Sequence, residues 1–120
     1  METKEIAKKL LDYCSKGDWS AAHEALYAEN AKSIEPYSTP DFPETETVGL
    51  QAIKAKGEKF DKMVDTMHSI DLSEPLIAGN TIAFTLTMDV TMKGQKRMAM
   101  PELCVYQVKD GKIASEEFFV

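Results

Sequence analysis

The sequence predicts an α+β fold in which three N-terminal helices pack on an antiparallel sheet. In the first half of the chain apolar residues recur three and four positions apart, as on one face of a helix. In the second half of the chain the apolar residues recur at every second position, as in a strand. The alternating segments are joined by short, glycine-containing breaks that leave no room for parallel crossovers. With 120 residues, 43% of them hydrophobic, the chain is expected to form one domain over residues 1–120 with a single core.

Two helices are expected first. Residues 3–15 place their apolar side chains on one helical face, namely Ile6, Ala7, Leu10, Leu11 and Cys14. Gly17 can end this helix in the left-handed conformation, and Asp18 can cap a second helix that begins at Trp19. The two helices form a short hairpin, and a brief strand is expected after them at Lys32–Glu35.

A loop and a third helix are expected next. Residues 36–48 hold three of the five prolines together with Ser, Thr and Asp, a composition typical of a loop. From Leu50 to about Thr66 the apolar positions again keep helical spacing. Gly57 within this helix costs about 1 kcal/mol relative to Ala, unless close packing requires a missing side chain. The lysines of this helix alternate with acids and are expected to form a solvated face: Lys54, Lys56, Lys59 and Lys62.

Alternation of apolar and polar residues predicts four strands after this helix, over residues 68–77, 80–92, 96–109 and 112–120. Asp110-Gly111 is a strong signal for a tight hairpin between the last two. In segment 80–92 one row of side chains is entirely apolar, from Ile82 to Met92, and is expected to face the core. In segment 96–109 both rows are rich in apolar residues, so both faces are expected to be buried. Three helices can cover only one face, and a homodimer through the sheet would cover the other.

Composition excludes several kinds of partner. The 14 Lys and Arg against 20 Asp and Glu give a net charge of -6, the wrong sign for nucleic acid or an anionic membrane. No stretch approaches the roughly 20 apolar residues that span a bilayer, and the first residues do not form a signal sequence, so a cytoplasmic protein is expected. Cys14 and Cys104 stand apart without metal-ligand spacing and are expected to be buried free thiols. Without a glycine-rich phosphate loop, no nucleotide cofactor is expected.

Three passages of the sequence resemble a known family. Tyr27–Pro36 (YAENAKSIEP), Val48–Ile53 (VGLQAI) and Val105–Ile113 (VYQVKDGKI) are similar to the first strand, the start of the third helix and the terminal hairpin of the nuclear transport factor 2-like superfamily. The nearest branch is the SnoaL-like one, which includes polyketide cyclases and relatives of ketosteroid isomerase. The resemblance covers the whole chain and implies a cone-shaped fold with a curved sheet around an apolar cavity. The same fold hosts enzymes, binding proteins and interaction domains, so it does not by itself assign a reaction.

The resemblance implies a place for a catalytic base. Enzymes of the family carry a carboxylate at the end of the first strand, and Glu35 occupies that position. An apolar cavity raises the pKa of a carboxyl group toward the working pH, which suits a general base. The alternative is a strand-end carboxylate that pairs locally. At the positions where the isomerases carry hydrogen-bond donors for the developing enolate, this chain has Leu10 and Cys104, so steroid isomerisation by that mechanism is not expected.

The resemblance of the terminal hairpin to that of the family also implies that two rows of its side chains point toward the cavity. With the inner row of segment 80–92 they give the expected ligand-binding residues: Phe84, Met88, Met100, Glu102, Cys104, Tyr106, Glu116 and Phe118. Carboxylates amid apolar neighbours are the informative exceptions. His68, expected to share a row with Ile70 and Leu72, could pair with one of these acids in acid–base catalysis. No metal site is predicted, because no known metal-ligand spacing is present.

The sequence leaves three kinds of function open. The leading hypothesis is a protein that binds a small apolar or carbonyl-containing molecule. As an enzyme it would be a cofactor-independent isomerase, cyclase or lyase, with Glu35 as base and His68 or Tyr106 assisting. The second hypothesis is a ligand-binding protein without catalysis. The third is an interaction module that works through its sheet face as a dimer.

Overall fold

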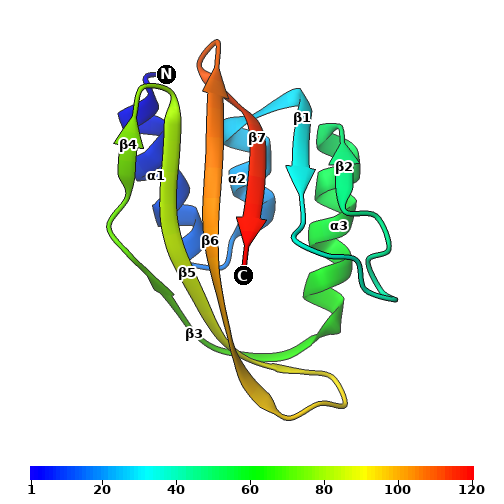
Figure 1. The fold of residues 1–120 in the computed structure, drawn as a ribbon. Coiled ribbons are helices and arrows are strands. Elements are labelled where there is room, and N and C mark those ends of the chain that lie inside the picture. The colour runs from blue at the N-terminus through cyan, green and yellow to red at the C-terminus, as the bar shows by residue number, and fades with distance from the viewer.

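The computed structural model describes residues 1–120. Its three helices and seven strands follow in the order α1 (Thr3–Ser15), α2 (Trp19–Leu26), β1 (Tyr27–Ile34), β2 (Glu46–Val48), α3 (Leu50–Met63), β3 (Val64–Leu72), β4 (Leu76–Ala78), β5 (Thr81–Met92), β6 (Arg97–Lys109) and β7 (Lys112–Phe119). The helices lie along one face of a curved sheet (Figure 1), which we call the inner face. The predicted α+β architecture is confirmed. No helix is long and apolar enough to cross a bilayer.

All strands belong to one sheet. Its order is β2-β1-β7-β6-β5-β3, and β4 pairs with β5 beside this path. Strand β1 runs parallel to β7, whereas the other pairs are antiparallel. The meander predicted for the second half of the chain is therefore present, and the one parallel pairing is that of β1 with β7. Because β7 lies between β1 and β6, residues from both ends of the chain meet in the middle of the sheet (Figure 1).

The elements differ from the predicted ones at four places, the first of which is the short strand β2 inside residues 36–48, where a loop was predicted. Strand β1 begins at Tyr27 and not at Lys32, because α2 ends at Leu26 and Tyr27 already has an extended backbone. Helix α3 ends at Met63, and the residues after it open β3. The strand expected over 68–77 is divided into β3 and β4, with an irregular break at residues 73–75. That break contains Pro75, which has no N–H for a strand ladder.

The core lies between the inner face of the sheet and the helices. The apolar row of β5, from Ile82 to Met92, is buried as predicted. It packs with buried residues of all three helices, such as Leu10, Leu26 and Ile53. Strand β6 behaves differently on its two faces, because its inner residues near the hairpin are buried while Leu103 on the outer face is 40% exposed. In the single chain the outer face of β6 is thus open, and the homodimer expected to cover it remains a prediction.

Candidate active site

A cavity of about 670 Å³ lies between the inner face of the sheet and the three helices. Of its 31 lining residues 20 are hydrophobic, so the few charged groups stand in a mainly apolar space. Eight of the residues expected from the sequence line it: Glu35, Met88, Met100, Glu102, Cys104, Tyr106, Glu116 and Phe118. The structure therefore brings together all three acids that were expected at the site.

Glu116 is the most enclosed of these acids. It lies on β7 with 4% of its surface exposed, opposite Ser33 in the parallel β1–β7 register. The Tyr27 hydroxyl donates a hydrogen bond to Glu116 Oε1, and Ser33 Oγ donates one to Oε2 at 2.7 Å. Burial raises the pKa of Glu116, and these two hydrogen bonds oppose the rise. Both carboxylate oxygens have partners, so Glu116 connects β7 to β1 within the cavity lining.

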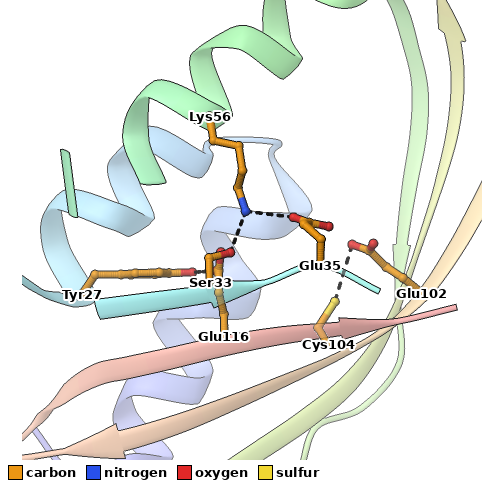
Figure 2. Close-up of polar contacts among 7 residues, drawn as sticks. All are labelled: Tyr27, Ser33, Glu35, Lys56, Glu102, Cys104 and Glu116. Atoms are coloured by element: carbon orange, nitrogen blue, oxygen red, sulfur yellow. Dashed lines mark hydrogen bonds and ion pairs between the residues drawn. The ribbon is translucent and has the colours of Figure 1, made fainter. Parts of the chain in front are cut away.

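Lys56 connects this acid to the next one. Its ammonium, from α3, donates to Ser33 Oγ at 2.6 Å and to Glu35 Oε1 at 2.8 Å (Figure 2). The side chains are shielded, with 17% of Lys56 and 29% of Glu35 exposed. The solvated face predicted for the lysines is therefore wrong for Lys56, and it is also wrong for Lys54, whose side chain is 19% exposed. The spacing of Lys56 from Ile53 and Phe60 on the apolar side of α3 was the available signal.

Glu102 differs from the other two acids because it has little hydrogen bonding. It lies on β6 across from Leu86, and its one partner is the Cys104 thiol, with Sγ 3.7 Å from Oε1, a weak donor. Burial raises the pKa of Glu102 to about 7, and the negative charge of Glu35 adds to the rise. Figure 2 shows its carboxyl group on the far side of Glu35 from Lys56. Glu102 is thus a carboxyl group that changes protonation near neutral pH and has a free oxygen.

His23, on α2, also lines the cavity, and the sequence patterns predicted no role for it. It is 7% exposed, and its Nδ1 has no hydrogen-bond partner. Its ring meets Tyr27 edge to face, with the ring centroids 4.8 Å apart. Burial lowers the pKa of His23 to about 4, and the positive charge of Lys56 adds to this effect. The imidazole is therefore neutral at neutral pH. Its helical spacing from Trp19 was a signal that it faces inward.

Two predicted site residues lie elsewhere. His68 is exposed on β3, and its Nε2 lies 2.8 Å from Thr91 Oγ1, away from the cavity lining. The reason is a bulge in β3 between Met67 and Ser69, which moves His68 out of the inward row expected for it. Phe84 is buried behind the cavity, where it stacks on Tyr106 with centroids 5.6 Å apart. The predicted pairing of His68 with a cavity acid does not occur in the structure.

The thiols are free and buried, as predicted. Burial raises the pKa of Cys14 to about 12 and raises that of Cys104 as well. Both thiols are therefore protonated at neutral pH, and a protonated thiol is a poor nucleophile. No three His, Cys, Asp or Glu side chains are grouped as metal ligands would be. The groups available in the cavity for acid–base chemistry and hydrogen bonding include carboxyl groups, one ammonium group, the neutral imidazole of His23 and hydroxyl groups.

A family model described as a SnoaL-like domain matches residues 1–120. The chain belongs to the SnoaL-like family. A Mesorhizobium loti protein described as a SnoaL-like polyketide cyclase is 29% identical to this SnoaL-like protein. The match covers 100% of both chains, with a TM-score of 0.90. No functionally curated protein matches the sequence.

More distant structures share the fold. A protein of unknown function with a cystatin-like fold from Xanthomonas campestris is 18% identical, with 99% of this chain and 90% of that one covered and a TM-score of 0.83. TerC, co-crystallised with polyporic acid, is 14% identical, with 98% and 88% covered and a TM-score of 0.79. The NTF2-like fold predicted from the sequence is thereby confirmed.

Proposed function

We propose that this SnoaL-like protein binds a small, mainly apolar molecule with a carbonyl group and acts on it as a cofactor-independent isomerase, cyclase or lyase. The observation that carries the proposal is that Glu102 lines an apolar cavity and has a pKa of about 7. A general base works best when its pKa is near the operating pH. The co-crystal of TerC with polyporic acid supports a small organic ligand.

Glu102 is the proposed base. Its carboxylate takes a proton from the carbon next to the carbonyl group, and the electron pair of the broken C–H bond forms an enolate. Returning the proton to another carbon completes an isomerisation. Attack of the enolate carbon on a second carbonyl of the same molecule completes a cyclisation, and loss of a leaving group completes an elimination. Glu35, the base implied by the family resemblance, already accepts a hydrogen bond from Lys56, which favours Glu102.

Ligand entry can be measured through Trp19. It is the only tryptophan and lines the cavity, so its fluorescence should change when a molecule enters. We expect a saturable change with bicyclic ketones and aromatic lactones, and none with hydrophilic sugars of similar size. Unchanged fluorescence and no heat of binding with every apolar probe would overturn the proposal.

Catalysis can be tested by proton exchange. In deuterated buffer the protein should catalyse exchange of the hydrogens next to the carbonyl group of a bound ketone, observed by proton NMR. Replacement of Glu102 by Gln should slow this exchange about 100-fold or more. The matched control is Glu117→Gln on β7, outside the cavity lining, which should leave the rate unchanged. Loss of exchange in Glu35→Gln but not in Glu102→Gln would move the base to Glu35. Binding of a ketone without hydrogen exchange would support a ligand-binding protein without catalytic activity.

We also propose that two copies pair through the outer face of the sheet. Leu103 and Phe119 are register partners on β6 and β7, and they are 40% and 44% exposed. Adjacent apolar side chains on a sheet face gain stability when another surface covers them. A second copy of the chain would bring the same patch to the contact, as a two-fold dimer requires.

A further inference from the structure

The cavity contains one cationic side chain, Lys56. The other charged residues in its lining are the carboxyl groups Glu35, Asp41, Glu102 and Glu116, and the low pKa of His23 keeps that ring neutral. An ammonium group has three N–H donors. Two of those of Lys56 are directed to Ser33 and Glu35, so one is left for a ligand.

The proposed reaction needs such a donor. Proton abstraction next to a carbonyl group places negative charge on the carbonyl oxygen, and enzymes stabilise that charge with hydrogen bonds. At the two positions where the family resemblance implies donors in the isomerases, this chain has Leu10 and Cys104, and both line the cavity. Leucine has no donor, and the Cys104 thiol is a weak donor already used by Glu102. Neither can serve a developing enolate.

The geometry points to Lys56 as the group that stabilises the enolate oxygen, an inference that rests on the proposed function. Lys56 approaches from α3 and Glu102 from β6, on opposite sides of Glu35 (Figure 2). A carbonyl compound beside Glu35 therefore has a base on one side and a cationic donor on the other. The proton moves from carbon to Glu102 and the C–H electron pair becomes the C=C bond of the enolate. The π pair of the carbonyl group moves onto its oxygen, and Lys56 keeps all its protons.

This arrangement also defines a ligand class. The preferred molecules are those whose conjugate base carries its charge on an oxygen conjugated with a carbon framework, such as enolisable ketones and phenols. A phenolate is a stable mimic of the enolate. Its neutral methyl ether has nearly the same size and shape but cannot ionise.

The test compares para-nitrophenol with para-nitroanisole. Wild-type protein should bind the phenol about tenfold more tightly than the ether, as expected for one charge-assisted hydrogen bond. The visible absorbance of the phenolate should show that the pKa of the phenol is lower in the complex than in water. The change Lys56→Met should abolish the preference while leaving the affinity for the ether nearly unchanged. Lys56→Arg, which keeps a cationic donor, should retain most of it.

The matched control is Lys54→Met. Lys54 lies on the same helix, pairs with Glu24 and is absent from the cavity lining, so its removal should keep the phenol preference. Retention of the preference in Lys56→Met would overturn the assignment of Lys56. So would a wild-type complex in which the phenol stays protonated, a measurement that requires no variant to fold. If neither probe binds to the wild-type protein, the proposed function fails together with this inference.

Discussion

The protonation of Glu102 makes the free energy of unfolding depend on pH. Below its ordinary pKa of 4.5 the group is neutral in the folded and unfolded states. Between that value and about 7 the folded state keeps a proton that the unfolded state has lost, so the free energy of unfolding falls as pH rises. Above about pH 7 the free energy of unfolding stays lower than below pH 4.5 by a constant amount of up to about 3 kcal/mol.

We predict that Glu102→Gln is stabilised relative to wild type in a pH-dependent way. The difference in unfolding free energy should grow by about 2–3 kcal/mol between about pH 4.5 and about pH 8, because Gln has no charge to bury. Urea unfolding at several pH values measures it. A flat difference for Glu102→Gln would mean that its carboxyl group is solvated.

His23 should make the free energy of unfolding depend on pH in the opposite direction. Its pKa falls from 6.5 to about 4 in the folded state, so between these values the unfolded state gains a proton that the folded state lacks. The free energy of unfolding therefore falls as pH decreases through this range. We predict that His23→Leu gains up to about 3 kcal/mol over wild type between about pH 6.5 and about pH 4. Guanidinium unfolding across this range tests it, and a protonated His23 resonance at pH 5.5 in the folded protein would contradict it.

At the level of single residues, part of the site could be predicted from the sequence. The acids were found because a carboxylate among apolar residues breaks a simple pattern, as Glu102 and Glu116 do. Lys56 and His23 were missed because lysine is common on helix surfaces and a lone histidine carries little pattern. Their inward orientation depends on how α2 and α3 are rotated against the sheet, which is set by tertiary packing.

Helix α3 provides a prediction at the scale of an element. Gly57 faces the cavity, and a Cβ built there would lie 3.4 Å from His23 Cε1, at van der Waals contact. We predict that Gly57→Ala raises the free energy of unfolding by about 0.5–1 kcal/mol through helix propensity. Gly57→Val should lower it, because its branched side chain would press against His23. Thermal unfolding of both variants measures the effects. A destabilised Gly57→Ala would show that the contact has no room for a methyl group.

The elements show why patterns in the sequence succeed and fail. Regular alternation in β5 predicted its inward row from Ile82 to Met92 correctly. The bulge in β3 lies between Met67 and Ser69. The added residue, His68, leaves the inward row, whereas Ile70 and Leu72 keep their place against the core. His68 was assigned to the wrong face for this reason. Nothing local in the sequence marks the bulge, because no glycine stands there.

At the scale of the whole molecule, the exposed apolar pair on the outer sheet face leads to a prediction of the oligomeric state. We predict a homodimer in sedimentation velocity at micromolar concentration, with Leu103 and Phe119 in the contact. Leu103→Asp should give a monomer, since a charge on this face would be desolvated in the dimer. Val48→Asp is the control, because Val48 is 60% exposed on the edge strand β2. A monomeric wild type at all accessible concentrations would contradict the prediction.

The overall architecture could be predicted further than the chemistry. Helix and strand periods extend over many residues, so local errors such as the late start expected for β1 did not alter the topology. The reaction depends on a few side-chain positions within the cavity. For Lys56 and Glu35 these come from an ion pair between α3 and the end of β1, which no local pattern encodes.

The position of β7 also affects how the domain is made. This strand is the last of the domain in sequence, yet it lies inside the sheet between β1 and β6. While a ribosome is still adding the residues before it, β1 has no neighbour on that side, and Tyr27 and Ser33 have no Glu116 to bond. Contacts between distant parts of a chain form slowly and leave strand edges open for longer. In the nascent domain β1 therefore keeps an open edge until β7 is available to pair with it.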